Sequence, residues 1–143
     1  MKNACLVVVF LTFCIFCGCS TSTTKSMSPE ETVRCYFSQF SDKSQSGMDA
    51  LVYEKMRGKD FDLNHLNSVK LISCTEENDT SKISSNKEWY SNPYKVALVH
   101  VAFDINYKSG GSSGGFNNGR YNWDYYLVKE NEKSDWIIVQ WGK

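Results

Sequence analysis

The stretch YKVALVHVAFDINY, residues 94–107, decides the fold class through the alternation of its side chains. One face of this stretch is apolar along its whole length, with side chains from Ala97, Val99, Val101, Phe103, Ile105 and Tyr107. The other face is apolar only as far as Leu98 and then carries His100 and Asp104. An alternation with a period of two predicts a β-strand with one face in a core. Because the second face changes character halfway, we expect this strand to belong to a curved sheet.

Other segments favour β-structure because they are rich in β-branched or aromatic side chains: residues 69–74, 121–129 and 136–141. In the second of these segments Trp123, Tyr125 and Leu127 share one face, which we expect to lie in the core. The glycine-rich residues 109–115 run straight into a strand, so we expect a flexible hairpin tip there.

The sequence before these strands predicts helices. Ser28 suits the N-cap of a helix, Pro29 its first position, and Glu31 the reciprocal bond of a capping box. Apolar residues then recur at helical spacing and form one stripe: Val33, Tyr36, Phe37 and Phe40. The polar run over residues 41–47 breaks this pattern.

A second short helix is expected around Leu51, Val52 and Met56, ending before Gly58. Helices first and antiparallel hairpins after them is the order of an α+β domain, in which the helices pack on one face of the sheet. We therefore predict the α+β class.

The first 18 residues are predicted to be an export signal. Lys2 is their one charged residue, and the uncharged run over residues 4–18 follows it. As a helix this run spans roughly 22 Å, against about 30 Å of bilayer hydrocarbon. We therefore expect the segment to be cleaved. The alternative is an uncleaved signal anchor.

The end of this signal, Phe16-Cys17-Gly18-Cys19, resembles a bacterial lipobox, in which a small residue precedes a cysteine that is acylated before cleavage. Phe16 stands where leucine is usual, whereas Gly18 and Cys19 occupy the two positions that the chemistry needs. We predict that Cys19 carries diacylglycerol, with palmitate-type chains, followed by a polar tether over residues 19–27 and a domain over 28–143. This anchor predicts a location on the extracytoplasmic face of a bacterial cell membrane.

Charge and composition narrow the range of partners. Residues 19–143 hold 15 basic and 16 acidic side chains without a block of one sign, so the sequence indicates no nucleic-acid partner. All four tryptophans and all eight tyrosines follow the tether, which favours a packed core. The two histidines, His65 and His100, lack the spacing of a zinc site, and we expect neither a metal nor a cofactor.

Four of the six cysteines lie in the first 19 residues, which leaves Cys35 and Cys74 for the domain. A disulfide between these two is one expectation for an oxidising compartment. The alternative is that both are plain small side chains. Cys35 lies on the side of the first helix opposite the apolar stripe.

The order of these segments resembles that of lipoproteins carrying domain of unknown function 4829. The similarity spans about residues 28–142 and is carried by SPEETV at 28–33, VKLI at 69–72, FNNG at 116–119, NWDYYLV at 122–128 and DWIIVQWG at 135–142. That family looks like part of the nuclear transport factor 2-like (cystatin-like) superfamily. The resemblance implies a strongly curved antiparallel sheet wrapped around the N-terminal helices as a cone with a pocket. Its motifs are structural and imply no catalytic residue.

Few residues are candidates for a site. His100 and Asp104 share a strand face about 13 Å apart if the strand is straight. With Tyr126 they could line the implied pocket, where the histidine and carboxylate would act as an acid/base pair. The alternative is that both are polar residues on a half-exposed face. Trp89 and Tyr90 lie in a polar loop and are candidates for an exposed contact, although folding back onto the sheet rim is the commoner arrangement.

The leading hypothesis is a lipid-anchored extracytoplasmic module that binds an unknown small ligand or envelope protein. It is not expected to be an enzyme, because no catalytic constellation is recognisable. The alternative is a small-molecule pocket enzyme of the isomerase or dehydratase kind that uses His100 and Asp104. A closed concavity lined by both residues would favour the enzyme, whereas exposure of both to solvent would argue against it.

Overall fold

The computed structural model describes residues 26–84, 90–108 and 116–143. In chain order the elements are α1 (Pro29–Ser41), α2 (Gln45–Asp49), the 3-10 helix η1 (Glu54–Met56), β1 (Leu66–Glu76), α3 (Thr80–Ser84), β2 (Lys95–Tyr107), β3 (Gly119–Lys129) and β4 (Ile137–Gly142). The strands form one antiparallel sheet in the order β1-β2-β3-β4. The predicted α+β class is confirmed. In the described residues no helix is long and apolar enough to cross a membrane.

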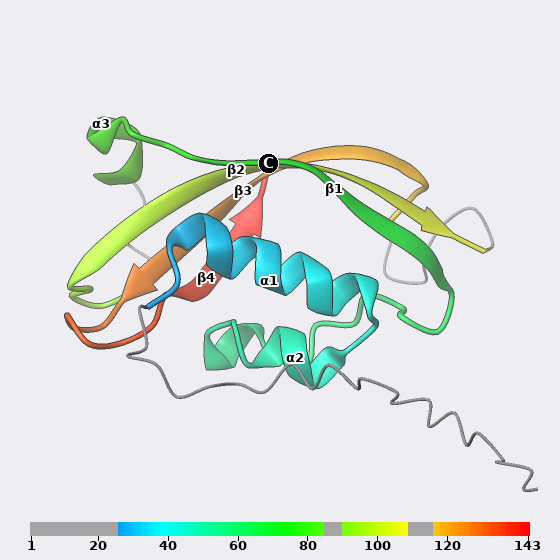
Figure 1. The fold of residues 1–143 in the computed structure, drawn as a ribbon, viewed down its shortest axis with the longest axis horizontal. Helices are drawn as coiled ribbons and strands as arrows, with labels where there is room; N and C mark the ends of the chain where they lie inside the picture. Colours follow the sequence, from blue (N-terminus) through cyan, green and yellow to red (C-terminus); the bar gives the residue numbers. More distant parts are fainter. Residues whose placement is uncertain (1–25, 85–89, 109–115) are drawn as a thin grey trace, which may run out of the picture.

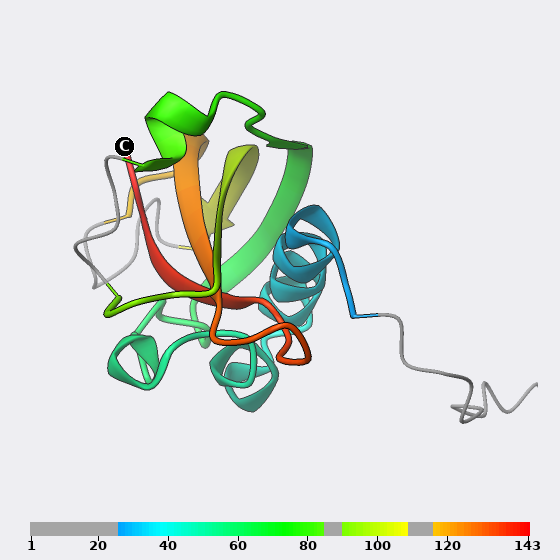
Figure 2. The same cartoon turned by 90° about the vertical axis from the view of Figure 1, so that its left-hand side faces the viewer.

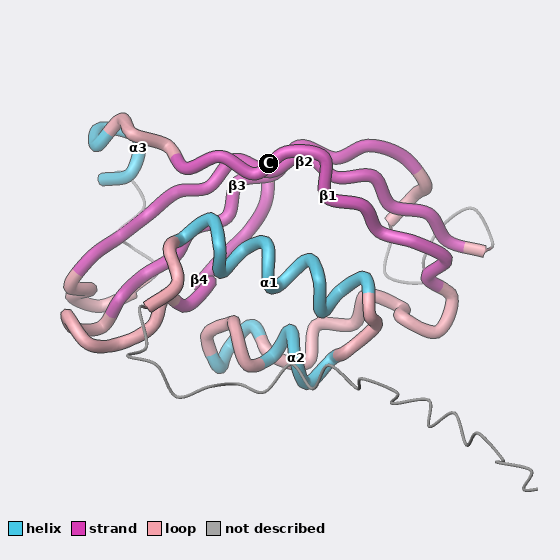
Figure 3. The backbone as a smooth tube through the Cα atoms, in the orientation of Figure 1, coloured by secondary structure: helices cyan, strands magenta, loops and turns pink. Residues whose placement is uncertain are grey.

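The sheet is bent into an arch over α1, with α2 beyond that helix on the same side (Figures 1 and 3). The concave face of the arch therefore holds the core, and the convex face points away from α1. All six side chains predicted for the inner face of β2 are at most 3% exposed: Ala97, Val99, Val101, Phe103, Ile105 and Tyr107. Register shifts interrupt the β1–β2 pairing on both sides of the segment from Ser68 to Leu71. Such irregularities bend and twist a strand.

Aromatic rings fill the space between α1 and the sheet. Phe37 lies 5.0 Å from Phe103 and 5.6 Å from Tyr125, measured between ring centroids, and Tyr36 lies 5.8 Å from Trp141. The recess bounded by Tyr36, α2 and η1 leaves no room for a water molecule. The concave side thus forms a packed core at this point.

The start of α1 is fixed by the capping box that the sequence predicts. The backbone N–H of Glu31 donates to the Ser28 hydroxyl at 3.1 Å, and the N–H of Ser28 donates to the Glu31 carboxylate at 2.6 Å. Pro29 occupies the first turn, where its missing N–H costs nothing. The predicted apolar stripe of α1 is buried.

The second helix differs from its prediction. It covers Gln45–Asp49 and so begins within the polar run 41–47 that interrupts the apolar pattern. The Ser44 hydroxyl caps it by accepting from the Gly47 N–H at 3.2 Å. Leu51 and Val52 are not helical, and Met56 ends the separate 3-10 helix η1. Apolar spacing alone misplaced this helix because these side chains are buried by tertiary contacts instead.

One of those contacts covers the outer edge of β4. Val52 forms a parallel bridge with Ile138, in which the Tyr53 N–H donates to the Ile138 carbonyl at 2.8 Å. The Ile138 N–H donates in turn to the Leu51 carbonyl at 3.0 Å. The segment after α2 thereby satisfies backbone groups that a free edge strand would expose.

Side chains of α1 cover the other outer edge, on β1. The Arg34 guanidinium donates to the Cys74 carbonyl at 3.0 Å, and the Glu30 carboxylate accepts from the Glu76 N–H at 2.9 Å. Near the far end of β1, Lys43 donates to the Leu66 carbonyl at 2.6 Å. Charged groups on α1, and Lys43 just after it, therefore take the place of a neighbouring strand.

The expected disulfide between Cys35 and Cys74 is not formed: both cysteines are free. Cys35 is half-buried on α1, whereas Cys74 is 4% exposed in the core. The Cys74 thiol donates weakly to the Glu30 carbonyl, with 3.8 Å between sulfur and oxygen. Burial raises the pKa of this thiol to about 11. This arrangement fits the alternative of plain small side chains.

Candidate functional site

The convex face of the sheet carries the polar side chains of β2, arranged in rows across three strands. The pairing register places Thr75, His100 and Asp124 in one row. The next row is made of smaller or neutral side chains, from Ser73, Ala102 and Asn122. The third places Asp104 opposite Arg120. The face is therefore a row of small side chains between two rows that contain charged pairs.

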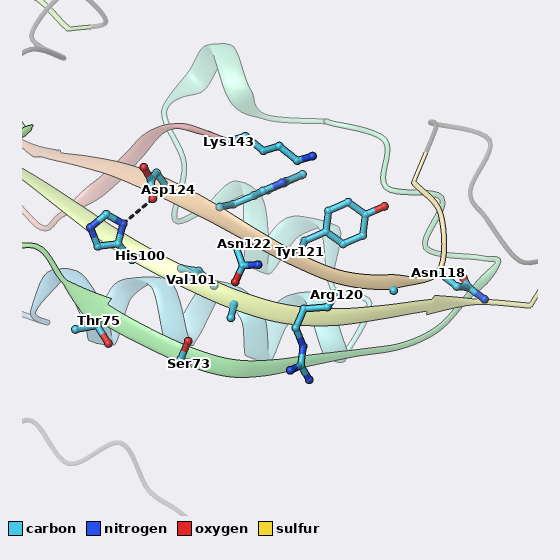
Figure 4. Close-up of a pocket in the computed structure, with 13 residues that line it drawn as sticks. Ser73, Thr75, His100, Val101, Asn118, Arg120, Tyr121, Asn122, Asp124 and Lys143 are labelled. Atoms are coloured by element: carbon cyan, nitrogen blue, oxygen red, sulfur yellow. Dashed lines mark hydrogen bonds and ion pairs between the residues drawn. The ribbon is translucent and has the colours of Figure 1, made fainter.

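His100 bridges two carboxylates. Its Nδ1 lies 2.6 Å from Asp124 Oδ1 on β3, and its Nε2 lies 3.1 Å from Glu77 Oε2, just after β1 (Figure 4 shows the first contact). Both contacts are satisfied together only when both ring nitrogens carry protons. Hydrogen bonds to Asp124 and then to Glu77 raise the pKa of His100 above its usual value of 6.5. The imidazolium form is thus favoured, and it has no free lone pair to act as a base.

Glu77 is the centre of a small network at the start of α3. Its carboxylate accepts from Lys82 at 2.8 Å and from the Asp79 backbone N–H at 2.9 Å, in addition to His100. The hydrogen bond from Lys82, followed by those from Asp79 and His100, lowers the pKa of Glu77 to about 2. Glu77 is therefore ionised throughout the physiological range of pH.

His100 and Asp104 are not brought together. Asp104 accepts two hydrogen bonds from Arg120: Nε donates to Oδ1 at 2.7 Å, and Nη2 donates to Oδ2 at 2.9 Å. This pairing lowers the pKa of the Asp104 carboxyl. The side chains of His100 and Asp104 are 45% and 43% exposed on the convex face. Neither lines a closed concavity, and each has partners other than those predicted.

An open groove of about 740 Å³ is lined by residues of β1, β2 and β3 together with Asn118 and Lys143 (Figure 4). Its lining includes the charged side chains of His100, Arg120 and Asp124. It also includes Ser73, Thr75 and Asn122, whose side chains make no hydrogen bond to another residue of the described segments. Tyr121 and Trp123 border it from the other side of β3, where they pack on Phe103. The arrangement offers neutral polar groups between ion pairs, which suits binding better than catalysis.

Tyr126, Trp89 and Tyr90 were the other residues predicted to line a pocket or to make a contact. Tyr126 is half-buried on the convex face, opposite Leu98 on β2 and Gln140 on β4, and it does not line the groove. Tyr90 donates to the Glu130 carboxylate, which raises the pKa of its phenol to about 12, and its ring packs edge-on against Tyr53. Tyr90 thus folds back onto the rim. Trp89 and Cys19 lie outside the described residues.

The other histidine belongs to a turn. His65 Nδ1 lies 2.6 Å from Asp62 Oδ1 immediately before β1, and its side chain is 61% exposed. Across the described segments no group of three histidine, cysteine or carboxylate side chains could hold a metal ion.

Glu77, Lys82, Arg120 and Asp124 were not singled out from the sequence. The pairing of His100 with Asp124 follows from the register of β2 against β3, and a glycine-rich connection does not fix that register. Alignment of the two apolar faces, Phe103 with Tyr121 and Val101 with Trp123, was the one available signal.

Comparison with known proteins gives a family but no characterised relative. The model of a family described as "Domain of unknown function (DUF4829)" matches residues 30–142. No curated protein and no solved structure matches the chain.

Proposed function

The chain belongs to the DUF4829 family, and from that starting point we propose that it is a lipid-anchored, extracytoplasmic binding module. It is exported, acylated on Cys19 and held at the outer side of a bacterial cell membrane by the polar residues 19–27. The domain then presents its convex face to a small ligand or an envelope protein. It carries out no catalysis.

The observation that carries this proposal is the N-terminal sequence. An uncharged run over residues 4–18 ends in Gly18 and Cys19, which is the composition of a lipoprotein signal. Diacylglycerol on a thiol supplies two acyl chains, and two chains are what stable membrane anchoring requires. The first described helix begins only at Pro29, which leaves a polar segment between lipid and fold.

We further propose that the domain is a nuclear transport factor 2-like cone. A bent antiparallel sheet wrapped around α1 supports this assignment (Figure 2). Within such a cone the usual ligand site lies on the concave side, but here aromatic rings occupy that space between α1 and the sheet. The convex groove beside Ala102 and Asn122 is therefore the surface that we assign to binding.

The alternative is a pocket enzyme that uses His100 and Asp104. The geometry gives it less support, because the two side chains are exposed and bound to other charged groups. A general base needs an unprotonated nitrogen or oxygen within reach of a substrate proton. Both ring nitrogens of His100 are instead directed at carboxylates.

The proposal is tested by following the chain in cells that produce Cys19→Ala. We expect the natural chain in the membrane fraction, accessible to protease added outside the cytoplasmic membrane. The substitution should lower the amount of mature, membrane-bound protein by about tenfold or more, because the site of acylation is lost.

Cys17→Ala is the matched control, since it removes a neighbouring thiol and leaves Gly18 and Cys19 intact. This variant should fractionate like the natural chain. Equal amounts of mature, membrane-bound protein that lacks residues 1–18 from Cys19→Ala and Cys17→Ala would contradict acylation at Cys19. A natural chain that keeps residues 1–18 would favour an uncleaved signal anchor.

A further inference from the structure

His100 joins parts of the chain that lie on both sides of β2. Asp124 belongs to the central part of β3, whereas Glu77 follows the last residue of β1 and leads into α3. The two carboxylates approach opposite nitrogens of one imidazole ring, at 2.6 and 3.1 Å. The ring therefore spans the sheet from the end of β1 to β3.

Glu77 also organises the turn that contains α3. Its carboxylate accepts from Lys82 within α3 and from the N–H of Asp79, while Asp79 accepts from both the N–H and the hydroxyl of Ser81. Through Glu77, the position of this turn is linked to His100. The hydrogen bond from the Glu77 N–H to the Leu98 carbonyl, at 2.8 Å, continues the β1–β2 ladder up to this point.

The turn lies on the convex side of the sheet, opposite α1, and α3 packs against β2 (Figures 1 and 2). At this end the convex face is apolar: Leu98 is 3% exposed and Val128 2%. Further along the same face, Ala102 is half-exposed and Asn122 is exposed. Segment Glu77–Ile83 thus lies at the end of the convex face that carries apolar side chains.

We propose that His100 is a pH-sensitive clamp that holds segment Glu77–Ile83 on the convex face. With a proton on each ring nitrogen, His100 donates to Asp124 and to Glu77 at once. A neutral imidazole has one N–H, so it can donate to one carboxylate and presents a lone pair to the other. Loss of the proton therefore loosens α3 above Leu98 and Val128.

The charges around the ring determine the direction of the effect. Asp124 on β3 and Glu77 after β1 face the ring directly, and Lys82 of α3 and Asp79 contact Glu77. Arg120 and Lys143 line the same groove as His100. The pKa of His100 is raised in the folded protein. The clamp is thus complete below the unfolded value near 6.5 and is lost as pH rises through the higher folded value. Glu77, with a pKa of about 2, stays ionised throughout.

This clamp does not depend on the proposed function, because it needs neither export nor acylation. A chain shown to lack the lipid could still possess it. A lipidated chain could equally lack it, so failure of one proposal leaves the other standing.

Amide hydrogen exchange on the full mature chain in detergent tests the proposal. Protection factors, corrected for intrinsic exchange, are compared at about pH 5.5 and about pH 8.5, below and above the usual pKa of a histidine. We expect protection in segment Glu77–Ile83 to fall several-fold at the higher pH, up to about tenfold for each unit by which the pKa of His100 is raised. Protection in α1 should stay unchanged.

His100→Gln should abolish this difference, because glutamine keeps a polar side chain but does not titrate. His65→Gln is the matched control: it removes the other histidine of the domain, in a turn before β1, and should keep the natural response. Equal protection at both pH values in the natural chain would overturn the proposal. So would a pH response that persists in a folded His100→Gln variant.

Discussion

His100 and Asp124 are 24 positions apart in the sequence, yet their side chains meet at 2.6 Å. The sequence indicates a polar face on β2 but not which residues of β3 stand opposite it. His100 and Asp104 could be named as a pair only because they are close along one strand. In a sheet, however, the partner directly across is nearer than the residue four positions along the same strand. His100 and Asp104 are therefore each bound to a residue on the neighbouring strand β3 and not to each other.

The two free cysteines illustrate how burial decides reactivity. Native protein treated with iodoacetamide should be alkylated at Cys35, whereas Cys74 should react about 100-fold more slowly than an ordinary thiol, because its pKa is raised to about 11. Peptide mapping by mass spectrometry measures the two rates. In denaturant both residues should react alike. Rapid labelling of Cys74 in the folded chain, or a Cys35–Cys74 disulfide in the purified protein, would contradict this account.

At the scale of elements, strands were more predictable than the second helix. Residues 94–107 and 121–129 were expected to be strands, and β2 and β3 cover Lys95–Tyr107 and Gly119–Lys129. Their alternation is long, so the period of two is unambiguous. The second helix has five residues, and its start depends on the Ser44 cap rather than on apolar spacing. The turn of α3 likewise depends on hydrogen bonds of Glu77 and Asp79, which apolar spacing does not reveal.

The side chains of α1 that bind the outer edge of β1 lead to a prediction about self-association of the chain. Glu30→Ala combined with Arg34→Ala removes the side chains that bind the Glu76 N–H and the Cys74 carbonyl. We expect a loss of about 1 kcal/mol in unfolding free energy, because the freed backbone groups exchange these bonds for water. We also expect increased self-association, since an open edge strand can pair with another chain. Urea denaturation and light scattering measure the two effects.

Glu54→Ala combined with Arg57→Ala provides the control. It removes the same pair of charges from exposed positions at η1. The control should leave both stability and association near those of the natural chain. If the two double variants behave alike, the side chains of α1 do not protect the edge.

At the scale of the whole molecule, fold and location have different sources. The fold follows from residues 28–142. Apolar periodicity and helix capping define most of the helices and strands, and the cross-strand register decides which side chains are neighbours on the surface. The proposed location rests on the first 19 residues, whose order of charge, apolar run, glycine and cysteine resembles a lipoprotein signal. The groove on the convex face could not be predicted, because it depends on the neighbours of Ala102 across three strands.

Mass spectrometry of the native protein, extracted from membranes with detergent, tests the central claim most directly. We predict a first residue of Cys19 whose mass includes a thioether-linked diacylglycerol, with residues 1–18 absent. Cys17→Ala should give the same terminus. A chain that begins at Met1, or a Cys19 terminus with an unmodified thiol, would contradict the account.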